Sequence, residues 1–203
     1  MVVKHIGILV FDDVEELDFV GPWEVFATAA NKAEATGQPV YRPLLIAENK
    51  GLRRCAKALR VLPDTDIASA PPLAILLIPG GQGTRREVNN PPLLNWIAKT
   101  AATAEWVTSV CTGALLLCAA GPARGKTVTT HWAFVEALKA RGEAKAVRDD
   151  CRFVQDGNLV SAAGVSAGID MALWLVGQLY TPDFARQVQR AIQYAPQPPY
   201  APA

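Results

Sequence analysis

The sequence has few cysteines, few histidines and almost no net charge, and each of these features argues against a class of protein. Four cysteines and two histidines occur in 203 residues, without the spacing of a metal site or a C-x-x-C pair, so we expect four free thiols and no metal. Lysine plus arginine number 20 against 19 for aspartate plus glutamate. This balance gives no reason to expect nucleic acid or an anionic membrane as a partner. No apolar run approaches the roughly 20 residues of a membrane span.

The sequence also lacks the basic, apolar and small-residue layout of a secretory signal. Met1 leads directly into a strand-like run, so we expect a cytoplasmic protein. Half of the residues are apolar and 19% are charged, which is typical of a globular chain with a sizeable core. We expect residues 1–195 to form a single α/β domain and the proline-rich residues 196–203 to form an extended tail.

Apolar runs of strand length alternate with helix-like segments along the chain. Residues 5–11, 41–47, 73–79 and 106–110 are nearly continuous apolar runs, typical of buried parallel strands. The intervening segments have apolar residues at helical spacing. The pattern predicts an α/β fold with a doubly wound, mainly parallel sheet and helices on both of its faces.

The character of the chain changes abruptly at Cys111. A β-branched run, 106–110, ends there, and good helix formers follow over 114–120. This is the pattern of a nucleophile elbow with cysteine in place of serine. At the carboxyl end of a parallel strand and facing a helix N-terminus, the thiolate of such a cysteine is stabilised. The alternative is a buried small apolar residue.

Two other loops are expected at the same edge of the sheet, and the first contains Asp18. This residue lies between apolar neighbours, just before a helix that we predict to start at Gly21-Pro22. It either caps that helix, which the spacing favours slightly, or it is a carboxyl group of raised pKa that holds a proton near the thiolate.

The second loop is rich in glycine. It consists of Gly80, Gly81, Gln82 and Gly83 and follows the run 73–79. Its spacing matches neither a P-loop nor G-x-G-x-x-G, so a phosphate cradle is not expected. The loop is a tight strand exit, an oxyanion hole whose N–H groups face the ligand, or both.

Histidine chemistry is a weaker hypothesis. His131 is either a base for Cys111, with Asp170 as its orienting group, or a histidine at a helix start that is bound to the backbone. The second interpretation is preferred. Thr112 places a hydroxyl and an N–H group directly beside the sulfur of Cys111.

Six stretches taken together resemble the ThiJ/PfpI family, within the class I glutamine amidotransferase-like folds. They are IGILVFDDVEELDFVGPWEVF, ILLIPGGQG, VTSVCTGALLLCAAG, TVTTHWAF, VQDGNLVSAAGVSAGIDMAL and VQRAIQYAPQPPY. The resemblance implies a flavodoxin-like fold. The Leu-Asp pair before Gly-Pro, the Cys-Thr-Gly turn, Thr-Thr-His-Trp and the Gln-Tyr-Ala-Pro ending are most similar to the isonitrile hydratase-like branch.

That branch implies a cofactor-free hydratase that converts small isonitriles to N-substituted formamides through a covalent thioimidate. The resemblance makes Cys111 the nucleophile, Asp18 its acidic partner and Thr112 a catalytic neighbour. It implies that N–H groups of the loop 80–83 and of Thr112 hold developing negative charge, and that His131 is peripheral. Family members are usually homodimers, so we expect a homodimer.

Two alternatives stay open. A redox-sensing, electrophile-sensing or glyoxalase-like protein would use the same Cys111. A cysteine peptidase or amidase would use Cys111 with His131, but peptidase members have histidine directly after the cysteine, where this chain has Thr112. The chain has neither the length nor the basic charge for the helix-turn-helix domain that related regulators add.

Overall fold

A computed structural model describes residues 2–197 of the chain. Its centre is a seven-stranded sheet with the order β10-β11-β7-β6-β1-β2-β5. Every neighbouring pair is parallel except β10 and β11, which confirms the predicted α/β class with a mainly parallel sheet. In that order the strands are Phe153–Asp156, Leu159–Ala162, Trp106–Val110, Leu73–Ile78, Val3–Leu9, Val40–Ala47 and Thr65–Asp66.

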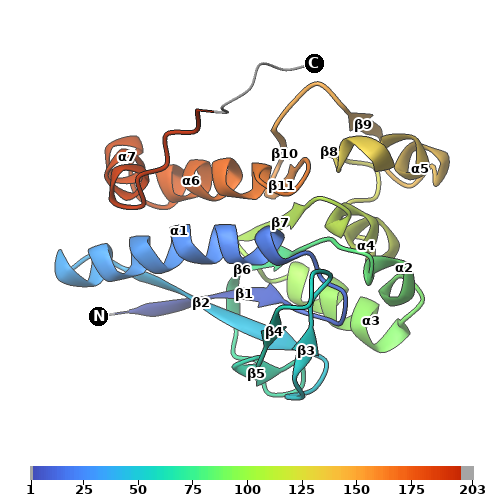
Figure 1. Cartoon of the computed structure of the whole chain (residues 1–203), viewed down its shortest axis with the longest axis horizontal. Coiled ribbons are helices and arrows are strands. Elements are labelled where there is room, and N and C mark those ends of the chain that lie inside the picture. The colour runs from blue at the N-terminus through green and yellow to red at the C-terminus, as the bar shows by residue number, and fades with distance from the viewer. Residues whose placement is uncertain (1, 198–203) are drawn as a thin grey trace.

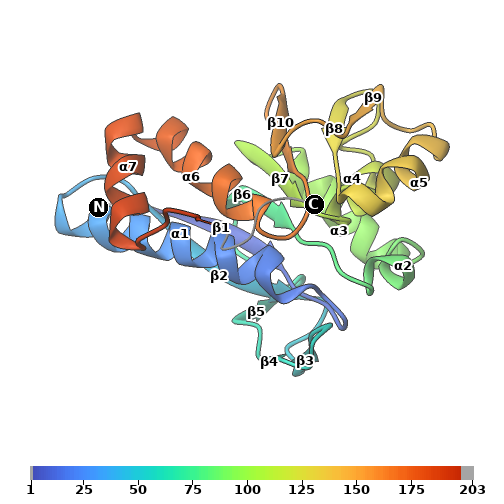
Figure 2. The same ribbon diagram turned by 45° about the horizontal axis from the view of Figure 1, so that its top comes forward.

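Helices cover both faces of this sheet (Figures 1 and 2). One face has α1 (Glu16–Ala35), α6 (Ala167–Leu179) and α7 (Pro182–Ala191), and the other has α3 (Pro91–Ala101) and α4 (Gly113–Ala120). The remaining elements are short: β3 (Arg53–Arg54), β4 (Arg60–Val61), α2 (Thr84–Glu87), β8 (Thr127–Thr129), η1 (Trp132–Phe134), α5 (Val135–Ala140) and β9 (Ala146–Arg148).

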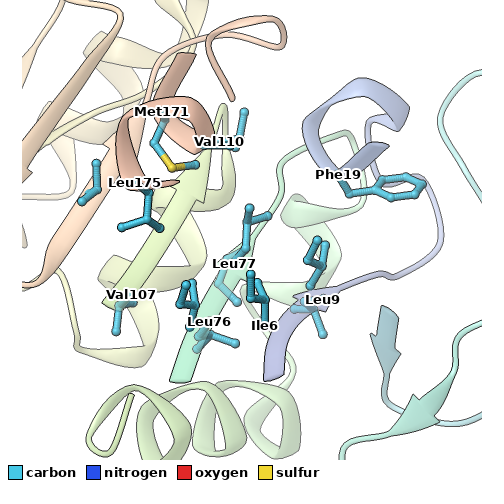
Figure 3. Packing of buried hydrophobic residues seen from close by; sticks show 14 of the residues in the cluster. Ile6, Leu9, Phe19, Leu76, Leu77, Val107, Val110, Met171 and Leu175 are labelled. Atoms are coloured by element: carbon cyan, nitrogen blue, oxygen red, sulfur yellow. The ribbon is translucent and has the colours of Figure 1, made fainter. Parts of the chain in front are cut away.

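The core lies between the sheet and its helices. All six residues of β6 are buried, because helices cover both sides of this central strand. Met171 and Leu175, one helical turn apart on α6, point toward β7 (Figure 3). Phe19 of α1 is buried on the side of the core near β1 (Figure 3). Continuous apolar runs in the sequence therefore correspond to strands that have no solvent-facing side.

The first helix begins at Glu16 and not, as predicted, at Gly21-Pro22. Proline suits the first turn of a helix, which motivated the prediction. Pro22 instead lies inside α1, where it cannot donate a hydrogen bond to the carbonyl group of Asp18. Asp18 is therefore a first-turn residue. The hypothesis that it caps the helix is wrong, because Glu15 occupies the N-cap position.

Two further sequence expectations concern membrane spans and the C-terminal tail. Within residues 2–197, no helix combines the length and apolar character needed to cross a lipid bilayer. Residues 198–203 of the predicted tail 196–203 lie outside the described residues.

Candidate active site

The candidate site lies where the order of the sheet reverses. From β1 the chain passes to β2 on one side, whereas β6 and β7 lie on the other side. The loops after β1 and β6 meet at this switch point, where the Glu15 N–H group donates to the Gly80 carbonyl at 3.0 Å. The carboxyl ends of the strands at such a point are the usual ligand position in open α/β sheets, and we call this edge of the site the crevice. The loop after β7 carries Cys111 to the same crevice.

Cys111 occupies the junction between β7 and α4 in a strained conformation. Its φ angle is +58°, in the left-handed region that residues other than glycine rarely adopt. The backbone is fixed on both sides. The Cys111 N–H group donates to the carbonyl groups of Ala162, at 3.1 Å, and Ala163, at 2.8 Å. The Thr130 hydroxyl donates to the Cys111 carbonyl at 2.8 Å. These contacts hold the side chain over the crevice.

Asp18 is completely buried, with 0% exposure. Its Oδ2 accepts a hydrogen bond from the Gly80 N–H group at 2.8 Å, and within the described residues Oδ1 has no hydrogen-bond partner. Burial raises the pKa of Asp18 to about 7, against smaller lowering effects of the Gly80 N–H group and the Cys111 side chain. The carboxyl group of raised pKa, which the sequence offered as an alternative, is thus present beside the cysteine.

The Cys111 thiol is also buried, with 6% exposure. Burial, followed by the charge of Asp18, raises its pKa to about 12. The N–H groups of Thr112 and Val165 lower the pKa, as expected at a helix start, but burial outweighs them. Burial therefore opposes the thiolate stabilisation that we expected from the helix N-terminus. Between these two pKa values the pair Cys111–Asp18 holds one proton and one negative charge.

The glycine-rich loop positions Asp18 and Thr112. The Gly80 N–H group donates to Asp18, and the Gly81 N–H group donates to Thr112 Oγ1 at 3.1 Å. The Gly83 N–H group donates to a carbonyl of the loop after β1, also at 3.1 Å. Because these three donors are engaged within the protein, the predicted oxyanion role does not apply to them. The N–H groups that act on the sulfur belong to Thr112 and Val165.

A small cleft opens over the sulfur, with a volume of about 150 Å³. Its walls are both polar and apolar, and Cys111 is 6% exposed. The cleft joins residues from five segments of the chain. Its lining consists of Glu15, Gly81, Gln82, Arg85, Cys111, Thr112, His131, Phe134 and Val165.

Four of these lining residues, Glu15, Arg85, Phe134 and Val165, were not among the sequence candidates. Arg85 lies with its guanidinium carbon 3.9 Å from the ring centre of Phe134. Val165 has a φ angle of +37°, an outlier for a β-branched residue and a common feature of functional sites. The position of Arg85 two residues after the glycine-rich loop was an available signal. Nothing in the sequence marks the backbone angle of Val165.

His131 lines the cleft but belongs to no catalytic triad. Its Nδ1 accepts a hydrogen bond from the Ala133 N–H group at 3.2 Å, as the preferred interpretation predicted. Asp170, the suggested orienting group, instead accepts from Arg152 Nε at 2.7 Å and from the Tyr194 hydroxyl at 2.9 Å. The Cys-His-Asp arrangement is therefore absent among these residues.

No group of three histidine, cysteine, aspartate or glutamate side chains in the described part of the chain is placed to hold a metal ion. The chemistry available at the cleft is that of the Cys111 thiol, whose pKa the buried Asp18 carboxyl group raises. Two backbone N–H groups and a guanidinium lie beside them.

The architecture and this site agree with a known family. The model of the DJ-1/PfpI family matches residues 4–178. The chain belongs to the DJ-1/PfpI family. This confirms the resemblance seen in the sequence and the flavodoxin-like fold that it implied.

Several known proteins are similar to this chain over nearly its whole length. Isonitrile hydratase from Pseudomonas putida is 38% identical over 97% of this chain and 81% of its own length. The Parkinson disease protein 7 homolog of Danio rerio is 24% identical over 93% of this chain and 96% of its own. The transcriptional regulator GbdR of Pseudomonas aeruginosa is 25% identical over 93% of this chain, which spans 49% of that protein.

Solved DJ-1/PfpI structures share the fold. A ThiJ/PfpI family protein from Pseudomonas syringae superposes with a TM-score of 0.87 at 30% identity, covering 98% of this chain and 78% of its own. Drosophila melanogaster DJ-1beta superposes with a TM-score of 0.81 at 19% identity, covering 97% and 100% of the two chains.

Proposed function

We propose that the protein is an isonitrile hydratase, which adds water to R–N≡C and releases an N-substituted formamide. One observation carries the proposal: a fully buried carboxyl group of raised pKa, Asp18, acts on the pKa of Cys111, which lies with a positive φ angle at a strand-to-helix junction. The 38% identity with the Pseudomonas putida isonitrile hydratase supports this choice of substrate.

The proposed first step forms a bond between the Cys111 sulfur and the terminal carbon of the isonitrile. The Asp18 carboxylate accepts the thiol proton and delivers it to the same carbon, while one C–N π bond is lost. The product is a thioimidate, Cys–S–CH=N–R. A group that gives and takes one proton needs a pKa near the working pH, and the pKa of Asp18, about 7, meets this requirement.

The proposed second step consumes one water molecule. Water adds to the C=N carbon, and Asp18 accepts one proton from that water and passes it to the nitrogen. The C–S bond then breaks as the hydroxyl proton of the tetrahedral intermediate moves to the sulfur, and the formamide leaves with its new C=O bond. The N–H groups of Thr112 and Val165, which lower the pKa of the thiol, stabilise negative charge at the departing sulfur. No histidine base and no organic cofactor enters this scheme.

The proposal includes a homodimer that works in the cytoplasm on a small-molecule substrate. Leu17 and Val20 of α1 are exposed at 38% and 40%. Leu52, directly before the β3–β4 hairpin, and Leu59, in its turn, are exposed at 56% and 45%. The Lys57 N–H group donates to Glu16 at 2.6 Å and ties this hairpin to α1. Such an exposed apolar surface supports a dimer interface. A reducing compartment supports a mechanism that needs a free thiol.

Sustained formamide formation is the expected result when the purified protein is mixed with a small uncharged alkyl isonitrile. NMR would follow the formyl proton of the product over many turnovers. A redox or electrophile sensor would instead consume one equivalent per thiol and stop. The burial and raised pKa of Cys111 argue against a sensor, because oxidation requires an accessible thiolate. Absence of formamide with a panel of isonitriles would overturn the proposed substrate.

Replacing Gly80 with alanine should lower turnover by on the order of 10²-fold, because small displacements of reacting groups are costly. A Cβ atom at this position would lie 2.5 Å from the Thr112 nitrogen and 2.9 Å from Asp18 Oδ2. Both neighbours would have to move. The matched control is Gly177→Ala within α6, where the nearest atom to the new Cβ is at 3.7 Å. Steady-state kinetics on both variants would check this, and an active Gly80→Ala protein would contradict it.

A further inference from the structure

A second cavity of about 240 Å³ adjoins the cleft over Cys111. The two spaces share the residues Arg85, Thr112 and Phe134. The rest of the second cavity is mostly apolar and comes from α4, α5 and the segments beside them. Its other lining residues are Leu115, Thr130, Ala137, Leu138 and Arg141.

Arg85, in the shared wall, is held by neutral groups. Its Nη1 donates to the Gly81 carbonyl at 2.6 Å and to the Thr84 hydroxyl at 3.0 Å, with Thr112 Oγ1 at 3.5 Å. The Phe134 ring covers the guanidinium plane. Within residues 2–197, Nε and Nη2 have no hydrogen-bond partner, and no carboxylate lies within ion-pair distance of the group. The edge of the guanidinium formed by these two nitrogens is therefore available to a ligand.

The other charged side chains around the two spaces have partners. Arg141 donates two hydrogen bonds to the carboxylate of Glu143, at 2.7 and 2.9 Å. Glu15 pairs with Lys57. Burial lowers the pKa of Arg85, and the acidic group acting to raise it is Cys111, which is a neutral thiol at neutral pH. The charge of Arg85 therefore lacks a direct counter-ion among the described residues.

We propose that the natural substrate is an isonitrile that carries a carboxylate, and that Arg85 binds this carboxylate through Nε and Nη2. A guanidinium edge binds a carboxylate by two parallel hydrogen bonds. A half-buried cation without a counter-ion is costly, and an anionic substrate removes that cost. The apolar walls formed by Leu115, Ala137 and Leu138 accommodate the hydrocarbon part. This inference rests on the proposed hydratase function.

The test compares isocyanoacetate with its uncharged methyl ester. The wild-type protein should have a kcat/KM at least about tenfold higher for the acid than for the ester. In Arg85→Gln, this ratio should fall about tenfold or more, because glutamine keeps hydrogen-bonding capacity but no charge. The control is Arg186→Gln on α7, whose side chain is 68% exposed and lines neither space, so this variant should keep the wild-type ratio. The proposal is overturned if the wild type shows no preference for the acid, or if Arg85→Gln retains it.

A binding experiment separates this inference from the proposed function. Hydration of isocyanoacetate gives N-formylglycine, so calorimetry with N-formylglycine and its methyl ester probes the same contact without turnover. If neither isonitrile is hydrated, the proposed function fails. Binding of N-formylglycine that weakens at least about tenfold in Arg85→Gln would then still support a carboxylate site at Arg85. Equal binding of the acid by both proteins, or no binding, would overturn it.

Discussion

Turnover of an isonitrile should fall by on the order of 10⁴-fold or more when Cys111 is replaced with alanine. The proposed reaction requires a covalent bond to the sulfur, and no other thiol lines the cleft. Alanine also leaves Asp18 without the group that shares its proton. The measurement is the rate of formamide formation by NMR, with intact-protein mass recorded after brief exposure to the isonitrile.

The matched control for this experiment is Cys118→Ala. Cys118 lies on the same helix, α4, and is fully buried at 0% exposure, but it does not line the cleft. This variant should retain turnover, and like the wild type it should show an adduct with the mass of one isonitrile molecule. An adduct that persists in Cys111→Ala, or an active Cys111→Ala protein, would refute the assignment of the nucleophile.

Replacing Asp18 with asparagine should move activity and stability in opposite directions. Turnover should fall by about 10²- to 10⁴-fold, the usual contribution of a positioned acid–base group, because asparagine cannot carry the proton from sulfur to carbon. In the wild-type protein, kcat/KM should rise with pH through about 7 as Asp18 ionises. The residual activity of Asp18→Asn should lack that step, which a pH series of initial rates would show.

The stability gain follows from the same pKa. The folded-state pKa of Asp18 is about 7 against the ordinary aspartate value of 3.8, so the native state binds more protons than the unfolded state between these pH values. Wild-type stability therefore falls as pH rises from about 4 to about 7, by roughly 4 kcal/mol. Asparagine removes this cost and keeps an acceptor for the Gly80 N–H group.

Thermal denaturation would measure the gain. The melting temperature of Asp18→Asn should exceed that of the wild type by more than about 5 °C at pH 8, and by less at pH 5. The control is Asp183→Asn, whose side chain is 79% exposed and should change the melting temperature little at either pH. A variant that is no more stable at pH 8 would show that Asp18 is not a strained carboxylate in the native state.

The sheet and the position of Cys111 were predictable because their signals are local. A continuous apolar run specifies a strand covered on both faces, and the change to helix formers after Cys111 marks the junction. The start of α1 was not predictable from Pro22. The hydrogen bond between the Glu15 N–H group and the Gly80 carbonyl, which joins segments far apart in the chain, accompanies the earlier start.

The missed parts of the site depend on tertiary burial. The sequence indicated a helix N-terminus beside Cys111, and the N–H group of Thr112 acts as expected. The sign of the net pKa shift depends on how much solvent reaches the sulfur, which no local pattern reports. Likewise Arg85 gains its importance from the Phe134 ring and the second cavity, which come from segments distant in sequence.

The 6% exposure of Cys111 affects how readily its thiol exchanges with the small thiols and disulfides of a cell. Exchange with a disulfide such as oxidised glutathione needs an ionised sulfur and room for a bulky leaving group, and a recessed, protonated thiol offers neither. A rod-shaped molecule with its reactive carbon at the tip can still approach end-on. We therefore expect the burial of Cys111 to protect the proposed nucleophile from thiolation while still admitting small, narrow reactants.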